Sequence, residues 1–183
     1  MKLKAVIAED DFRVAAIHEK FLGNFEGIEV VGKALNGKET IEILKKEKPD
    51  LLLLDVYMPD QLGTDLLPNI RKQFSNLDII MITAATDKEL FTKALHYGVE
   101  YFLIKPVKME RFNETIEEYL NKHQLLQSKQ EIDQDFVDLI LKKSAPSTTT
   151  KETALPKGID EITLVKVRNV LENSKTSLSA EQV

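Results

Sequence analysis

Residues 51–63 read LLLLDVYMPDQLG, and this stretch decides the fold. The four leucines at 51–54 predict a strand that is buried on both faces, as the inner strands of a parallel sheet are. The strand ends at Asp55, and Pro59 and Gly63 mark the loop that follows it. Taken alone, an aspartate after a buried strand is more often a turn residue than a functional group.

Short apolar runs and helical patterns alternate on both sides of this stretch. Apolar residues at helical spacing predict helices, and short runs rich in branched apolar residues predict strands. The predicted strands cover 3–8, 28–32, 51–54, 78–82 and 100–104, and the predicted helices cover 12–22, 37–48, 64–74, 88–97 and a long stretch from Lys108. Five strands alternating with five helices predict an α/β fold, a five-stranded parallel doubly wound sheet with helices on both faces.

The length and composition exclude several classes of protein. The chain has 183 residues and a formal charge of −5, which fits one domain with an appendage. It has no cysteine, which excludes disulfide frameworks, thiolate nucleophiles and cysteine zinc sites. The three histidines lie far apart in sequence, and we expect His18 to be a helix side chain at the surface or the core edge. No apolar run approaches the ~18 residues of a membrane span, and no secretory signal is evident, so we expect a cytoplasmic protein.

The net charge is confined to the first two thirds of the chain. Residues 1–121 hold 16 Lys/Arg and 21 Asp/Glu, whereas positive and negative residues balance in 122–143 and in 144–183. An acidic segment such as 1–121 is not typical of a surface that binds nucleic acid. Residues 122–183 have no excess of Lys and Arg either.

Chemically matched groups follow four of the predicted strands. They are the pair Glu9-Asp10, then Asp55, Thr83 and Lys105. The carboxyl ends of parallel strands share one edge of the sheet, so these side chains can converge. Clustered carboxylates repel one another, and Mg²⁺, which prefers oxygen ligands, relieves that repulsion. A carboxylate beside Mg²⁺, with a cation and a hydroxyl opposite, suits phosphoryl transfer with Asp55 as the in-line nucleophile.

Each group alone has a simpler explanation. The acids at 9–11 are suited to cap the helix that follows them. Thr83 suits an ordinary strand end, and Lys105 suits solvent with Pro106 as a turn residue. The joint pattern favours a functional site, because four matched groups each stand at the end of a strand.

Residues 1–121 resemble the receiver domain of two-component response regulators, a flavodoxin-like fold. The resemblance rests on Glu9-Asp10, the D-x-x-M-P-x-x-x-G segment at 55–63, Thr83-Ala84 and Lys105-Pro106. It implies an aspartyl phosphate on Asp55. It also implies that Mg²⁺ is held by Asp10, Asp55 and the backbone carbonyl of Tyr57, with Glu9 acting through water.

The resemblance implies further roles around the phosphoryl group. Thr83 would hydrogen-bond the phosphoryl group, Lys105 would pair with it, and the Lys105–Pro106 bond would be cis. Phe102 occupies the position of the family's switch aromatic, and core packing is its alternative explanation; we expect both. A receiver catalyses only its own phosphorylation and dephosphorylation and is not an enzyme for outside substrates.

The remaining residues are organised differently. A helix is predicted over 133–143, a low-complexity linker over 144–151, and a helix over 159–172 with Leu164, Val167 and Leu171 on one face. Residues 13–22 and 155–183 resemble the citrate/C4-dicarboxylate (CitB-type) subfamily of response regulators. We therefore expect a receiver domain at 1–121, a helical linker and low-complexity segment at 122–158, and the start of a truncated helix-turn-helix DNA-binding domain at 159–183.

The chain ends on a helix-start signal. Residues 179–182 form an S-x-x-Q capping box, with Leu178 as the staple residue, and the chain stops at Val183. One interpretation is that a longer protein has been cut here, with the recognition helix beyond Val183. The other is a frayed polar terminus, and the sequence favours neither.

The resemblance implies a membrane-bound sensor histidine kinase that detects a carboxylate such as citrate, malate or fumarate. Promoter DNA would be the partner of the full-length protein, and a homodimer could form on phosphorylation. The long amphipathic helix at 108–126 could mediate dimerisation, or it could equally be only the last helix of the receiver and a connector. The alternative is a receiver that signals by protein contacts only. A phosphatase of the aspartyl-phosphate type is disfavoured, because it needs an aspartate where this chain has Tyr57.

Overall fold

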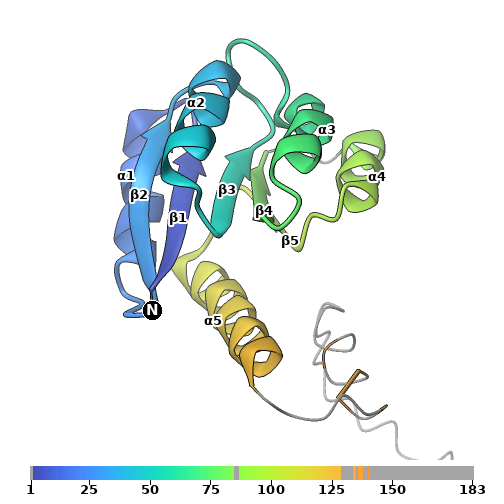
Figure 1. The fold of residues 1–183 in the computed structure, drawn as a ribbon. Helices are drawn as coiled ribbons and strands as arrows, with labels where there is room; N and C mark the ends of the chain where they lie inside the picture. The colour runs from blue at the N-terminus through green and yellow to red at the C-terminus, as the bar shows by residue number, and fades with distance from the viewer. Residues whose placement is uncertain (1, 85–86, 129–133, 135, 138–139, 141–183) are drawn as a thin grey trace, which may run out of the picture. The chain divides into compact units, whose positions relative to one another are not determined.

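Strand β3 (Leu51–Asp55) lies at the centre of a five-stranded parallel sheet, and all five of its residues are buried. The strand order is β2-β1-β3-β4-β5 (Figure 1). The other strands are β1 (Leu3–Ala8), β2 (Ile28–Ala34), β4 (Asp78–Thr83) and β5 (Tyr101–Ile104). The helices are α1 (Phe12–Leu22), α2 (Gly37–Glu47), α3 (Gly63–Gln73), α4 (Lys88–His96) and α5 (Met109–Gln127). The doubly wound parallel sheet predicted from the sequence is confirmed.

The computed structural model describes residues 2–84 and 87–128, together with 134, 136–137 and 140. Most of the predicted helix at 133–143, and all of the predicted elements after it, lie outside the described residues. Among the described helices, none is both long and apolar enough to cross a membrane.

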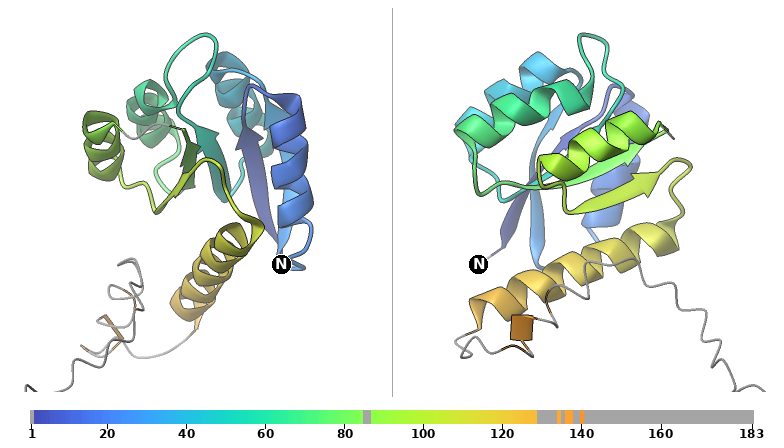
Figure 2. Two further views of the ribbon diagram at one scale, coloured as in Figure 1. Left: turned by 180° about the vertical axis from the view of Figure 1, so that it is seen from behind. Right: turned by 90° about the vertical axis from the view of Figure 1, so that its right-hand side faces the viewer.

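The sheet carries a hydrophobic core on each face. On β1, Val6 and Ala8 pack in the core beneath α2, α3 and α4, whereas Ala5 and Ile7 pack in the core beneath α1 and α5. Figure 2 shows the two layers of helices from behind and from the side. The helix after β1 covers one face and the helix after β3 covers the other, although β1 and β3 are neighbours. The carboxyl ends of β1 and β3, from which the chain leaves to opposite faces of the sheet, form the switch point at which sheets of this kind bind ligands.

Four strand boundaries differ slightly from the predicted ones. Strand β3 includes Asp55, strand β5 begins at Tyr101 rather than at residue 100, and the ends of β2 and β4 also differ. Strand β2 continues to Ala34, two residues beyond the predicted end, because its pairing with β1 shifts register between Ala5 and Val6 and then runs on to the Ala8–Ala34 pair. Strand β4 includes Thr83, which pairs with Ile104 of β5. The structure therefore places Thr83 on the sheet itself rather than in the loop.

The inward face of α1 is narrower than the sequence pattern indicates. Phe12 and Ile17 belong to the apolar residues whose spacing predicts a helix over 12–22, but 70% of Phe12 and 49% of Ile17 is exposed. The buried residues are Ala15, His18 and Leu22. These lie on one stripe at helical spacing, and Phe12 and Ile17 fall outside it.

His18 is a core residue, which corrects the expectation that it lies at the surface or the core edge. It is 4% exposed, and its ring stacks on Phe112 of α5 with centroids 5.8 Å apart and planes at 10°. Burial lowers the pKa of His18 from 6.5 to about 4, and the positive charge of Lys105 acts in the same direction.

Acidification should therefore remove stability that depends on neutral His18. In the unfolded chain His18 takes up a proton near pH 6.5, but in the folded chain only near pH 4. The stability is present above pH 6.5 and is lost as the pH falls toward 4, by about 2 kcal/mol between pH 7 and pH 5. Urea denaturation at both pH values, on the wild type and on His18→Leu, measures this loss.

The measured quantity is the difference in unfolding free energy between the wild type and His18→Leu. This difference is needed because Glu9 also titrates in this pH range, and its effect on stability has the opposite sign. Its raised pKa makes folding more favourable as the pH falls. The unfolding free energy of the wild type minus that of His18→Leu should fall by about 2 kcal/mol between pH 7 and pH 5. A difference that is equal at both pH values would contradict the assignment.

Candidate functional site

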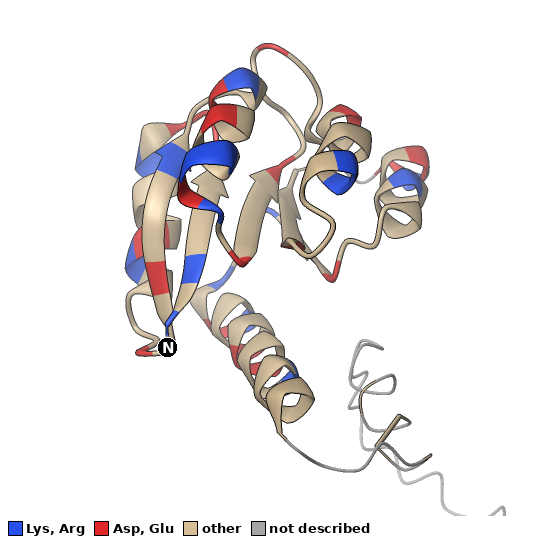
Figure 3. Ribbon diagram, viewed as in Figure 1, with Lys and Arg blue, Asp and Glu red and all other residues tan. Residues whose placement is uncertain are grey.

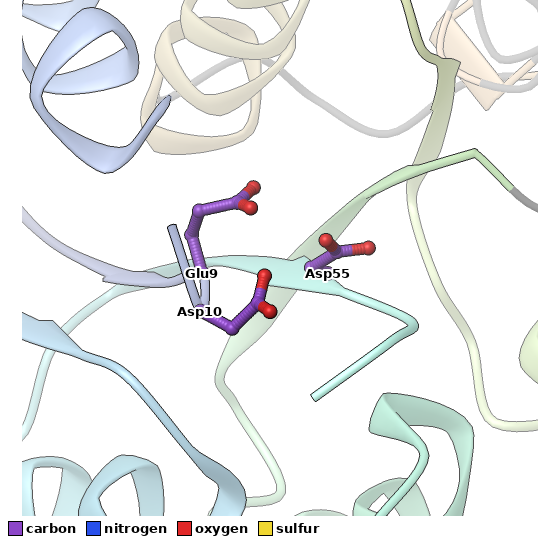
Figure 4. A group of neighbouring side chains, drawn as sticks. All are labelled: Glu9, Asp10 and Asp55. Carbon is purple, nitrogen blue, oxygen red and sulfur yellow. The ribbon is translucent and has the colours of Figure 1, made fainter. Parts of the chain in front are cut away.

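Three carboxylates converge at the switch point of the sheet. Glu9 and Asp10 follow β1, Asp55 ends β3, and the two strands pair directly up to Ala8 and Leu54. One oxygen from each of the three side chains lies within 4.8 Å of the others (Figure 4). Glu9 and Asp55 are buried, and Asp10 is exposed. The next acid, Asp11, turns away and caps α1 by accepting a hydrogen bond from the backbone N–H of Arg13.

Lys105 joins the carboxylates from two strands away. It follows β5, its backbone N–H donates to the carbonyl of Thr83 at 2.8 Å, and the peptide bond to Pro106 is cis, as predicted. Its Nζ donates to Glu9 Oε2 at 2.7 Å, to Glu9 Oε1 at 3.0 Å and to Asp55 Oδ2 at 2.6 Å. The ammonium group thus bridges two buried carboxylates.

Burial and charge set the protonation of this cluster. Burial raises the pKa of Glu9 from 4.5 to about 6, and the hydrogen bond from Lys105 opposes the rise. Burial lowers the pKa of Lys105, but its hydrogen bonds to Asp55 and Glu9, together with the negative charge of both carboxylates, raise it overall. With all groups ionised, three carboxylates face one ammonium, and the excess negative charge favours a cation.

The donor set fits Mg²⁺. Carboxylate oxygens, a backbone carbonyl and water are the ligands that this ion takes in proteins. The backbone N–H of Tyr57 donates to Asp55 Oδ1 at 3.3 Å, which keeps the Tyr57 peptide beside the cluster. The Tyr57 side chain is 48% exposed.

The loop after Asp55 returns very close to the strand that it leaves. The backbone N–H of Gly63 donates to the carbonyl of Val56 at 2.7 Å. A Cβ atom at position 63 would lie 2.1 Å from the backbone oxygen of Asp55, a distance at which no side chain fits. Gly63 is thus the residue that allows α3 to begin beside the candidate site.

Thr83 and Phe102 lie on the side of the site nearest α4. Thr83 is buried and stands one residue beyond Ile82, the partner of Asp55 on β4. The Phe102 ring on β5 packs edge-on against Phe91 of α4, with centroids 4.8 Å apart. Both side chains line a pocket of about 320 Å³ with Val56, Leu90 and Phe91. Core packing, one of the two roles expected of Phe102, is present.

Sequence analysis missed a contact between the loop and another helix. The carboxylate of Asp60 accepts hydrogen bonds from the backbone N–H groups of Gly37 and Lys38 at the start of α2. No local pattern indicates this contact, because the partners lie 23 and 22 residues apart in sequence.

Comparison with known proteins identifies a family model that matches the receiver part and relatives that match nearly the whole chain. The family model for the response regulator receiver domain matches residues 5–117. The transcriptional regulatory protein CitT of Bacillus subtilis strain 168 is 45% identical over 177 residues, which are 97% of this chain and 78% of CitT. The protein named "Probable C4-dicarboxylate response regulator DctR" from the same organism is 36% identical, over 98% of this chain and 78% of DctR.

Solved structures match the receiver part. The REC domain of AraT, a response regulator from Geobacillus stearothermophilus, superposes with a TM-score of 0.65 and 26% identity, over 70% of this chain and all of that domain. A CheY-like receiver domain protein from Methanospirillum hungatei JF-1 gives a TM-score of 0.62 and 27% identity, over 68% of this chain and 98% of that protein.

Proposed function

The chain belongs to the family of response regulator receiver domains, and from this membership and the site we propose that it accepts a phosphoryl group on Asp55 from a membrane-bound sensor histidine kinase. The observation that carries the proposal is the placement of Asp55. It ends the central strand, is 5% exposed, lies within 4.8 Å of two other carboxylates and is hydrogen-bonded to Lys105.

The proposed reaction needs little beyond positioning and charge. A carboxylate oxygen of Asp55 attacks the phosphorus of the kinase phosphohistidine, a P–O bond forms, and the P–N electron pair returns to the imidazole. Mg²⁺ held by Asp10, Asp55 and the Tyr57 carbonyl, with Glu9 acting through water, would neutralise charge on the phosphoryl oxygens. Lys105 already lies against Asp55 and pairs with the phosphoryl group as it arrives.

Phosphorylation acts, on this proposal, as a local charge switch. The phosphoryl oxygens attract the Thr83 hydroxyl and Lys105, and Phe102 turns into the space that Thr83 leaves. The packing of Phe102 against Phe91 supports this proposal, because it links the ring directly to α4. A change at Asp55 would then alter the surface formed by α4 and β5.

The proposed output is control of transcription for the uptake or metabolism of carboxylates of the citrate, malate or fumarate type. The names of CitT and DctR support this assignment. Figure 3 shows acidic and basic residues intermixed on α2, α3, α4 and α5. We assign the receiver to 1–121, a linker to 122–158 and promoter binding to a domain that starts at 159–183. We further propose a cytoplasmic location and a homodimer on phosphorylation.

Transcript measurements test this output. In the organism that carries the gene, a deletion strain should lose the induction of carboxylate uptake or metabolism genes by added citrate, malate or fumarate, and the wild-type gene should restore it. RNA sequencing with and without each acid reads this out. Unchanged induction by all three acids in the deletion strain would contradict the proposed output.

A further inference from the structure

The loop from β3 to α3, residues 56–62, is fixed at its base. Tyr57 and Leu62 form an isolated antiparallel bridge across the loop. Met58 is buried in the core beneath α2, α3 and α4. These contacts hold both ends of the loop next to Asp55, and the tip of the loop lies beyond them.

The tip is fastened to a different element. Asp60 Oδ1 accepts a hydrogen bond from the backbone N–H of Gly37 at 2.8 Å, and Oδ2 accepts one from Lys38 at 3.0 Å. The first N–H groups of a helix have no partner within the helix, and a negative charge is favoured there. The hydrogen bond from Gly37 is the main reason that the pKa of Asp60 is lowered. In Figure 1 this loop arches from β3 past the end of α2.

Helix α2 also has a cap of its own. Asn36 Oδ1 accepts a hydrogen bond from the backbone N–H of Glu39 at 2.9 Å, and the Glu39 side chain accepts one from Leu35 at 2.9 Å. Asp60 therefore accepts hydrogen bonds from the Gly37 and Lys38 N–H groups, which Asn36 does not contact. The first turn of α2 is capped by its own sequence and by the loop that carries Tyr57.

The approach of the loop tip is close. A Cβ atom at Gly37 would lie 2.7 Å from Nε2 of Gln61, the neighbour of Asp60. The Gln61 side chain therefore packs directly over the start of α2, next to the hydrogen bonds that Asp60 accepts. Pro59, with its fixed φ, lies between this tip and the Tyr57 peptide and stiffens the connection.

We infer that Asp60 is a positioning residue for the metal ligands: by tying the loop tip to α2, it adds to the contacts at the base of the loop and restricts the movement of the Tyr57 peptide beside Asp55. The inference rests on the proposed function, in which the Tyr57 carbonyl is a Mg²⁺ ligand. A loop that is attached to α2 before the metal arrives loses less conformational freedom on binding, so binding carries less ordering cost. Without Asp60, the loop tip has lost two hydrogen bonds and samples other conformations.

The test compares two helix caps on the full chain. Asp60→Ala removes the hydrogen bonds from the loop, and Asn36→Ala removes the local cap of the same helix. Titration of ¹⁵N-labelled protein with MgCl₂, followed by the amide shifts of Tyr57 and Gly63, gives the affinity. Asp60→Ala should bind Mg²⁺ about tenfold more weakly, the low end for outer partners of metal ligands. Asn36→Ala should bind like the wild type.

A third variant separates position from charge. Asp60→Asn is uncharged but keeps one acceptor oxygen, so its affinity should lie closer to the wild type than that of Asp60→Ala. The inference is overturned if Asp60→Ala binds like the wild type, if Asn36→Ala is weakened equally, or if Asp60→Asn is as weak as Asp60→Ala. If the wild type itself shows no Mg²⁺ binding, the proposed function fails as well as the inference.

Discussion

Asp55→Asn should abolish phosphorylation of the chain. The asparagine side chain fits the same buried space at the end of β3, but its neutral amide is not a nucleophile toward phosphorus. The neighbouring acids are poor substitutes, because both oxygens of Glu9 accept hydrogen bonds from Lys105, and Asp10 is exposed beyond the end of its strand. The intact mass after incubation with acetyl phosphate and MgCl₂ should show one phosphoryl group on the wild type and none on the variant.

Two controls accompany this experiment. Asp11→Asn makes the same chemical change next to the site, but Asp11 caps α1, and asparagine is an equally good cap. This variant should be phosphorylated like the wild type. Chelation of Mg²⁺ with EDTA should remove the phosphoryl signal from the wild type, because the three carboxylates then repel the incoming phosphoryl group. A phosphorylated Asp55→Asn would move the acceptor to another residue.

Gly63→Ala should be among the most destabilising single substitutions in the receiver. The added Cβ would lie 2.1 Å from the backbone oxygen of Asp55 and 3.2 Å from the Leu54 side chain, within the central strand. Because the clash is with backbone, either the strand or the start of α3 must move. Overpacking in a core costs about 1–3 kcal/mol, and we expect a loss of about 3 kcal/mol or more. Urea denaturation measures it, and phosphorylation by acetyl phosphate should slow in parallel as Asp55 shifts.

Gly23→Ala is the matched control. Gly23 lies at the C-terminal end of α1 with φ −62 and ψ −14, and an added Cβ would meet only two backbone oxygens at 3.4 Å. Alanine adopts this conformation without strain and reduces the entropy of the unfolded chain, so we expect a change between zero and about 1 kcal/mol of stabilisation. If Gly63→Ala were as stable as the wild type, the close approach at Asp55 would not exist in solution.

The sequence was sufficient for the sheet because the signals of parallel strands are local. The leucines at 51–54 indicate a strand buried on both faces without any knowledge of its neighbours, and all four are buried. The positions of Asp55 and Lys105 could be predicted for the same reason, since each directly follows a predicted strand. Parallel topology then brings the ends of β3 and β5 to one edge, where Lys105 bridges Asp55 and Glu9.

The features that could not be predicted from the sequence depend on contacts between residues that are distant in sequence. His18 is polar, so no apolar pattern indicates that it lies inward, and its place in the core is set by stacking on Phe112 of another helix. Phe12 is apolar but exposed, because the inward stripe of α1 begins at Ala15. The contact of Asp60 with α2 follows from the path of a loop over a helix, which neither segment encodes alone.

The location of the phosphoryl group on the wild-type chain tests the central claim most directly. The protein is incubated with acetyl phosphate and MgCl₂, the acyl phosphate is reduced with borohydride, and peptides covering residues 1–128 are sequenced by mass spectrometry. Reduction converts a phosphorylated aspartate to homoserine. We expect homoserine at position 55 and at no other aspartate. A reduced acid at position 9 or 10, or a phosphoryl group on a histidine with Asp55 unmodified, would contradict the account.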